Sequence, residues 1–348
     1  MTIWNPIDPV NPDILLSGKR QWDRIAKPIE GLGKMETLIT KIAGAQHKVQ
    51  VDIGKKAVVV FCADNGVVKQ KISQVDSSVT ANIVRSVQGG TSSVAVMAKT
   101  VGAQVFVYDV GVLSDEPGVI NRKLLYGTED ISEGPAMSRE VAIATMEKGM
   151  EAIAELKEKG YNLVATGEAG IGNTTTSAAV AGALLGLEAE VVTGKGSGLT
   201  QEAFLHKIEI VKKSWEVNDI AHTKDAIDVI ARVGGLDIAA LTGAYLGAAM
   251  NHLPIIMDGI ISAVAALCAF SINPGVKDYI IPSHMSMEPA MVKICEKLEM
   301  EPVIYANMHL GEGTGAVLLM SMLDTVMAVY NSNTTFDKIE VKQYERLG

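Results

Sequence analysis

Short apolar runs alternate with longer helical segments along most of the chain. The runs predict strands at 57–62, 104–110, 163–166, 191–192 and 254–257. Helices are predicted at 77–101 with a break near 89–90, and at 138–159, 174–185, 201–218, 236–250 and 260–270. Short apolar strands that alternate with helices are typical of a mostly parallel sheet with helices on both faces. We therefore predict an α/β fold.

The two ends of the chain differ from this middle part. Residues 1 to about 50 look helical and lack a strand signal, with a helix from Lys34 onward. An apolar helix is predicted at 316–330, where it could pack beside the N-terminal helices.

Composition and charge exclude several classes of protein. The formal net charge of −9 argues against a general nucleic-acid surface, which needs clustered Lys and Arg. The most hydrophobic stretch, 253–270, is interrupted by Pro254, Asp258 and Gly259, and so does not resemble a membrane span. The isolated thiols Cys62, Cys268 and Cys295 and the lack of an apolar leader favour a reduced, cytoplasmic protein.

A glycine-rich turn follows the strand predicted at 163–166. It reads Gly-Glu-Ala-Gly-Ile-Gly-Asn-Thr, from Gly167 to Thr174, and leads into a helix. Glycines let backbone N–H groups approach a ligand, and the N-terminus of the following helix favours an anion. A phosphate cradle beside the carboxylate of Glu168 is one interpretation; a tight connection capped by Glu168 or Asn173 is the other. The turn matches neither the Walker motif nor GxGxxG, which disfavours nucleoside triphosphate chemistry.

A second glycine-framed acid lies near the C-terminus. Glu312 stands between Gly311 and Gly313, before the last predicted helix. A carboxylate flanked by glycines is open to a substrate, and an apolar environment would raise its pKa and make it a better base near neutrality. A capped turn without catalytic meaning is the alternative.

Two further sets of residues have side chains that could take part in catalysis or bind a metal ion. Ser283, His284 and Glu288 could form a nucleophile triad, although no GxSxG elbow is present. A metal site could use His284 and Asp258 with either Glu288 or Asp64, as in a metal-dependent hydrolase. Isolated histidines are more often structural, so both interpretations are weaker than the two glycine turns.

Several passages, in order along the chain, together resemble one family. It is the nicotinate-nucleotide:dimethylbenzimidazole phosphoribosyltransferases, which make the lower-ligand nucleotide of cobalamin. The resemblance runs from about residue 20 to 325 and is carried by residues 27–33, 63–67, 134–139, 167–176, 233–237, 253–259, 281–284 and 310–316. It implies a large Rossmann-like domain, here 51–315, and a small helical domain from 1–50 and 316–348, usually in a homodimer.

The resemblance also implies roles for individual residues. Glu312 occupies the position of the catalytic base, and no metal or organic cofactor is implied. The residues assigned to the phosphate and ribose of nicotinate mononucleotide are Glu168, Gly170, Gly172, Asn173, Thr174, Gly194, Gly196, Ser197 and Lys207. The residues assigned to the aromatic acceptor are Val75, Ile83, Ser286, Met287 and Leu310.

The chain departs from the family pattern at several positions. Asn65 replaces a His, His309 replaces an Arg, and we align Val75-Asp76 and Ile83 with a Ser-Pro pair and a Gln that line the acceptor pocket. An apolar wall there suggests phenol or p-cresol as an acceptor beside dimethylbenzimidazole. The family branch that activates phenolics is a heterodimer of paralogous chains. A heterodimeric partner is therefore an alternative to a homodimer, and so is a catalytically silent role for this chain.

Overall fold

The computed structural model describes residues 6–196, 198–332 and 334–346. Its centre is a six-stranded sheet in the order β3-β2-β1-β4-β5-β6, in which every neighbouring pair is parallel. The strands are β1 Lys56–Ala63, β2 Ala103–Gly111, β3 Ile120–Asn121, β4 Leu163–Ala169, β5 Ile255–Met257 and β6 Ile280–Pro282. The predicted α/β fold with a parallel sheet is confirmed.

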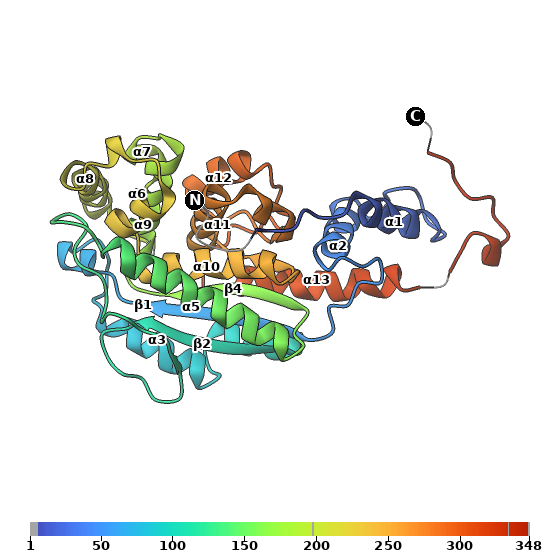
Figure 1. Ribbon diagram of the computed structural model, residues 1–348, viewed down its shortest axis with the longest axis horizontal. Helices are drawn as coiled ribbons and strands as arrows, with labels where there is room; N and C mark the ends of the chain where they lie inside the picture. The colour runs from blue at the N-terminus through green and yellow to red at the C-terminus, as the bar shows by residue number, and fades with distance from the viewer. Residues whose placement is uncertain (1–5, 197, 333, 347–348) are drawn as a thin grey trace.

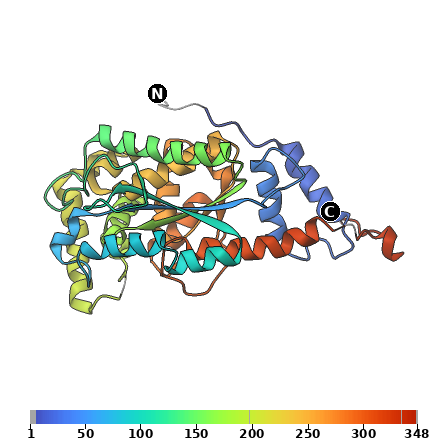
Figure 2. The same ribbon diagram turned by 90° about the horizontal axis from the view of Figure 1, so that it is seen from below.

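Helices cover both faces of this sheet (Figures 1 and 2). The α-helices are α1 Pro12–Asp23, α2 Lys34–Ala45, α3 Ser78–Gln88, α4 Ser93–Thr100, α5 Arg139–Glu158, α6 Asn173–Leu185, α7 Ala189–Val192, α8 Gln201–Val217, α9 Ala226–Val233, α10 Leu236–Met250, α11 Ile260–Ile272, α12 Ala290–Leu298 and α13 Thr314–Tyr330. Helices α5, α10 and α11 lie on one face, and α2, α3, α4 and α13 lie on the other.

The first strand explains why both faces need a cover. All eight residues of β1 are buried, and successive side chains point to opposite faces of the sheet. Val59 and Phe61 belong to the hydrophobic core under α5 and α10, whereas Val58 and Val60 belong to the core under α3 and α13. A continuous apolar run is therefore the sequence signal of a central parallel strand.

The strand predicted at 191–192 is wrong. These two valines end the short helix α7, in which the N–H of Thr193 donates to the carbonyl of Ala189 at 3.0 Å. Val192 is buried while Val191 is 43% exposed, so only one of them has an apolar neighbour to pack against. A pair of β-branched residues is too short to prefer a strand when no neighbouring strand is available to pair with it.

Helices from both ends of the chain lie side by side at one end of the molecule. Helices α1 and α2 pack together, and α13 extends past the sheet to reach α2 (Figure 1). Ile25 forms an antiparallel bridge with Thr335, and the Arg346 guanidinium pairs with Asp23 at 3.0 Å. The domain boundaries at 51 and 315 stay a prediction. In the described ranges, none of the helices combines the length and the apolar character that crossing a bilayer requires.

The order of the strands locates the place where a ligand is expected. The strand order changes direction between β1 and β4, and ligands of open α/β sheets bind at such a point, beyond the carboxyl ends of the strands. Glu168 lies at the end of β4, and Asp258 directly follows β5. Their neighbours at this edge form the candidate site.

Candidate active site

The turn that carries Glu312 has an unusual backbone. Gly311, Glu312 and Gly313 have φ values of 87°, 61° and 99°, so all three adopt left-handed conformations. Glycine accepts such values without strain, whereas a glutamate in this region is uncommon and must be held by its surroundings. The turn ends where α13 begins at Thr314.

Close backbone packing against β4 holds this turn. A Cβ on Gly167 would lie 2.3 Å from the carbonyl oxygen of Glu312, and one on Gly311 would lie 2.5 Å from Oε1 of Glu168. Side chains at either glycine would push the turn away from the strand. The glycines therefore bring two segments that are far apart in the sequence into contact.

Glu168, at the end of β4, contacts the turn of Glu312. Its Oε1 accepts the N–H of Glu312 at 3.3 Å, and its Oε2 accepts a hydrogen bond from Nδ2 of Asn173. The same amide nitrogen also donates to Oδ2 of Asp237 at 3.1 Å. Burial, reinforced by the nearby Asp237, raises the pKa of Glu168 to about 8, although the hydrogen bond from Asn173 opposes the shift. Glu168 is therefore largely protonated at neutral pH.

We expect Glu168 to make the stability of the folded protein depend on pH. A carboxyl with a pKa of about 8 in the folded state and 4.5 in the unfolded state stabilises the fold below pH 4.5, and this contribution is lost as the pH rises through 8. Urea unfolding of the wild type and of Glu168→Gln at pH 5, 6.5 and 8 tests this. Between pH 5 and pH 8, the free energy of unfolding of the wild type is expected to fall by about 2 kcal/mol or more relative to that of Glu168→Gln.

The exposed Glu158 offers a control for that measurement. Glu158→Gln, at the end of α5, is expected to follow the wild-type dependence on pH. Equal slopes for the wild type and Glu168→Gln would contradict the prediction.

Glu312 itself is half-buried and faces the cavity. Burial raises the pKa of its carboxyl, and the negative charge of Asp258 adds to this shift. The N–H of Val94 opposes it through a long contact of 3.5 Å to Oε2. A carboxyl with a raised pKa is a stronger proton acceptor than an exposed one, which suits a general base.

The opposite wall of the cavity carries a buried cation. Lys207 on α8 is 1% exposed, and its Nζ donates to Oγ1 of Thr174 at 2.9 Å. Burial lowers the pKa of Lys207 to about 8, and the charge of Glu288 opposes this shift. A Cβ on Gly196 would lie 3.5 Å from the same Nζ, so the loop runs closely past the lysine. A dianionic phosphate beside Thr174 would stabilise the charge of the ammonium group and raise its pKa again.

One cavity of about 260 Å³ joins these elements. Most of the residues that the sequence assigned to the site line it: Ile83, Glu168, Gly170, Gly172, Asn173, Thr174, Gly196, Lys207, Ser286, Leu310 and Glu312. Sequence reasoning assigned no substrate role to other lining residues, among them Ser73, Lys195, Asp258, His284, Glu288 and His309. The sequence signals for these residues were the position of Asp258 after the strand predicted at 254–257, the set of Ser283, His284 and Glu288, and the replacement of an Arg by His309.

Three of the assigned residues lie outside this cavity, and one cannot be placed. Val75 is 42% exposed and does not line the wall, whereas Ser73, two residues earlier, does. Met287 and Gly194 line a neighbouring cavity that shares Gly196 with the first. Ser197 lies outside the described residues. The cavity wall is thus lined by the hydroxyl-bearing Ser73 as well as by the apolar Ile83.

The hydrolase interpretations find only part of the geometry that they need, because Oγ of Ser283 lies 3.1 Å from Nδ1 of His284 but Glu288 does not join this pair. Oγ of Ser283 donates to the carbonyl of Met257 at 2.6 Å, and Oε1 of Glu288 accepts the N–H of Gly196 at 3.0 Å, so serine and glutamate serve different partners. Asp64 is occupied by the N–H of Leu113 at 2.9 Å. Within the part of the chain that the structure describes, no three His, Cys, Asp or Glu side chains converge as a set that could hold a metal ion.

The comparison with family models gives the class of this protein. Residues 7–341 match a family model with the description "Phosphoribosyltransferase". The curated relatives narrow this class further. A nicotinate-nucleotide–dimethylbenzimidazole phosphoribosyltransferase of Ruminiclostridium cellulolyticum is 44% identical over 345 residues, which cover 99% of this chain and 98% of the relative. An enzyme of the same name from Clostridium acetobutylicum is 44% identical over 331 residues, 94% of either chain.

A solved structure supports the same assignment. The crystal structure of CobT from Thermus thermophilus superposes with a TM-score of 0.89 at 34% identity, covering 96% of this chain and all of the other. The chain belongs to the nicotinate-nucleotide–dimethylbenzimidazole phosphoribosyltransferase family. The resemblance found in the sequence is confirmed.

Proposed function

We propose that this protein transfers the 5-phosphoribosyl group of nicotinate mononucleotide to an aromatic lower-ligand base, with Glu312 as the general base. The observation that carries the proposal is the shared cavity. It joins a half-buried glutamate of raised pKa to a buried Lys207–Thr174 pair that suits a phosphate. The names of the relatives supply the donor nucleotide and dimethylbenzimidazole as the first candidate acceptor.

The chemistry follows from the charges of the substrate. Nicotinate mononucleotide carries a cationic pyridinium on C1′, so the bond between C1′ and nitrogen breaks with its electron pair moving to the leaving nicotinate. A ring nitrogen of the acceptor forms the new bond to C1′ from the opposite face, and Glu312 takes the proton that the acceptor loses. Attack from that face converts the β-linked nucleotide into an α-linked ribotide. A phosphate fixed at Lys207 orients C1′ toward Glu312, and such positioning can supply roughly 7–11 kcal/mol at best.

The residues that line the acceptor pocket favour a heteroaromatic base. A phenolic acceptor is the alternative that the assay below distinguishes. Ser73 offers a hydroxyl that could hydrogen-bond a benzimidazole nitrogen, while Ile83 and Leu310 supply apolar contact. A phenol would need only the apolar contact and would pass its hydroxyl proton to Glu312. The hydroxyl on this wall therefore favours dimethylbenzimidazole over phenol and p-cresol.

A competition assay tests the reaction and the acceptor together. The purified chain is incubated with nicotinate mononucleotide and equal amounts of dimethylbenzimidazole, phenol and p-cresol, and ribosylated products are identified by mass spectrometry. We expect α-ribazole phosphate as the main product. Preferred phenolic products would overturn the assignment of the acceptor. Absence of all products with the chain alone, but not with a paralogous chain added, would instead identify a subunit that needs a partner.

A further inference from the structure

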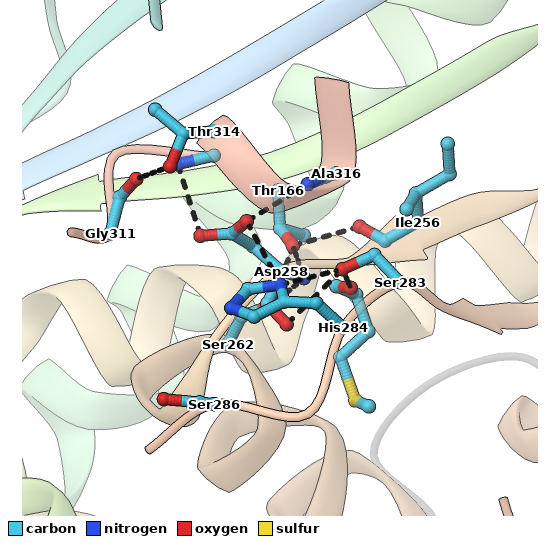
Figure 3. A network of polar contacts seen from close by, with 12 residues as sticks. Thr166, Ile256, Asp258, Ser262, Ser283, His284, Ser286, Gly311, Thr314 and Ala316 are labelled. Atoms are coloured by element: carbon cyan, nitrogen blue, oxygen red, sulfur yellow. Dashed lines mark hydrogen bonds and ion pairs between the residues drawn. The ribbon is translucent and has the colours of Figure 1, made fainter. Parts of the chain in front are cut away.

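Asp258 is a buried carboxylate that binds the backbone on both sides of the start of α13. It follows β5, is 2% exposed, and accepts the N–H of Gly313 at 3.1 Å through Oδ2 and the N–H of Ala316 at 2.9 Å through Oδ1. Gly313 is the neighbour of Glu312 in the chain. Figure 3 shows the carboxylate between the first turn of α13 and the imidazole of His284. A negative charge is well placed there because the first N–H groups of a helix lack partners within the helix.

The strand end that carries Asp258 is itself fixed. The backbone N–H of Asp258 lies 3.1 Å from Oγ of Ser262 and 3.3 Å from Oγ1 of Thr166, and these two hydroxyls also bond each other at 2.5 Å. On the other side, Nδ1 of His284 lies 3.9 Å from Oδ1 of Asp258 (Figure 3). The carboxylate therefore has little freedom to follow the turn if the turn moves.

The left-handed turn around Glu312 depends on such contacts. The N–H of Glu312 is bound by Glu168, that of Gly313 by Asp258, and the carbonyl of Gly311 by Oγ1 of Thr314 at 2.8 Å. A left-handed glutamate does not keep its conformation by local preference, so these bonds must define where its carboxylate points. Of Glu168 and Asp258, only Asp258 also binds α13, through the N–H of Ala316.

We propose that Asp258 is a positioning residue for the transfer reaction, which fixes the turn of Glu312 on the N-terminus of α13. The inference rests on the proposed function of Glu312. Asp258 affects where the carboxylate of Glu312 points relative to the acceptor. It does not affect the binding of the nucleotide phosphate, which we assign to Lys207 and Thr174. A displacement of the base of about 1 Å is enough to lower a rate about 10²-fold.

Asp258→Asn tests this role, because the amide keeps the size of the side chain but can present only one acceptor oxygen to the two N–H groups. We expect kcat to fall about 10-fold to 100-fold, while the Kd of nicotinate mononucleotide, measured by calorimetry, changes by less than about 3-fold. Asp130→Asn is the matched control. Asp130 is also buried and accepts the N–H of Ser132 at 2.9 Å, but it does not line the cavity.

The pH profile of kcat separates positioning from a merely structural role. Burial raises the pKa of Asp258 as well as that of Glu312, and wherever Asp258 is ionised its negative charge adds to the shift of Glu312. Loss of that charge in Asp258→Asn is therefore expected to move the acidic limb of the profile to lower pH. Asp258→Glu keeps the charge but moves it, so kcat should fall without that shift. The other ionisable groups that line the cavity are Glu168 on β4, His284 after β6, Glu288 before α12, Lys195 before α8, Lys207 on α8, and His309 before the turn of Glu312.

Each result has a distinct meaning. Wild-type kcat in Asp258→Asn at intact nucleotide binding overturns the inference and leaves the proposed function standing. Inability of both Asp258 variants to fold, under conditions in which Asp130→Asn folds, also overturns it, because Asp258 then serves the fold alone. An inactive wild type overturns the proposed function first, and the inference with it.

Discussion

Glu312→Gln is expected to lower kcat about 10²-fold to 10⁴-fold, the range that a general base contributes. The amide is nearly the size of the carboxylate but cannot accept the acceptor's proton. The weak contact of Glu312 Oε2 with the N–H of Val94, at 3.5 Å, is replaceable by the amide oxygen, so the fold and the binding of nicotinate mononucleotide should persist. Initial rates of ribotide formation and calorimetric titration with nicotinate mononucleotide measure the two effects separately.

Glu299→Gln is the matched control for that variant. Glu299 is also a glutamate with positive φ, at 51°, but it is exposed at the end of α12 and does not line the cavity. We expect wild-type kcat for it. Retention of more than about a tenth of the activity by Glu312→Gln would rule out the role of Glu312 as base, because a general base contributes at least about 10²-fold.

Lys207→Met is expected to weaken the binding of nicotinate mononucleotide about 10²-fold, with a smaller effect on kcat. Methionine keeps the length and apolar character of the buried stem but loses the charge that a phosphate would meet. Truncating one partner of a buried, hydrogen-bonded charge pair typically costs 2–5 kcal/mol in a complex, and 1.4 kcal/mol corresponds to a factor of ten. Stability of the free protein should not suffer, because the burial that lowers the pKa of Lys207 to about 8 already disfavours its charge.

Two comparisons make this prediction specific. Lys212→Met changes a lysine on the same helix that pairs with Glu190 at the surface, and it should bind the nucleotide like the wild type. Nicotinate riboside, which lacks the phosphate, should bind the wild type and Lys207→Met equally weakly. Wild-type affinity of Lys207→Met for the nucleotide would show that the phosphate is held elsewhere.

The sequence predicted the layers of the fold well because strand burial and helix periodicity are local signals. The long run at 57–62 lies within β1, and the glycines at 89–90 separate α3 from α4 as expected. The short strands β3 and β6 were missed, and 191–192 was wrongly taken as a strand. Segments of two or three residues carry too little periodicity, and their state depends on whether a neighbouring strand pairs with them.

The site was predicted unevenly for a similar reason. Glycine spacing identified the turns of Glu168 and Glu312, but the hydrogen bond between them joins residues 144 positions apart and has no local signal. Alignment with a family pattern placed Val75 in the acceptor pocket, whereas Ser73, two residues earlier, lines the cavity and Val75 does not. Asp258 directly follows the strand predicted at 254–257, but its bonds to Gly313 and Ala316 emerged only in the folded chain.

The sequence by itself determined the class of fold, the family, and the residue types that chemistry would need, since these depend on patterns within short segments. Only the tertiary structure decided which acids share a cavity, which of them are buried enough for their pKa to rise, and what holds a left-handed glutamate in place. The physical reason is that burial and electrostatic coupling depend on distances in space, which β4, β5 and α13 set only when the sheet has formed and α13 has packed on it.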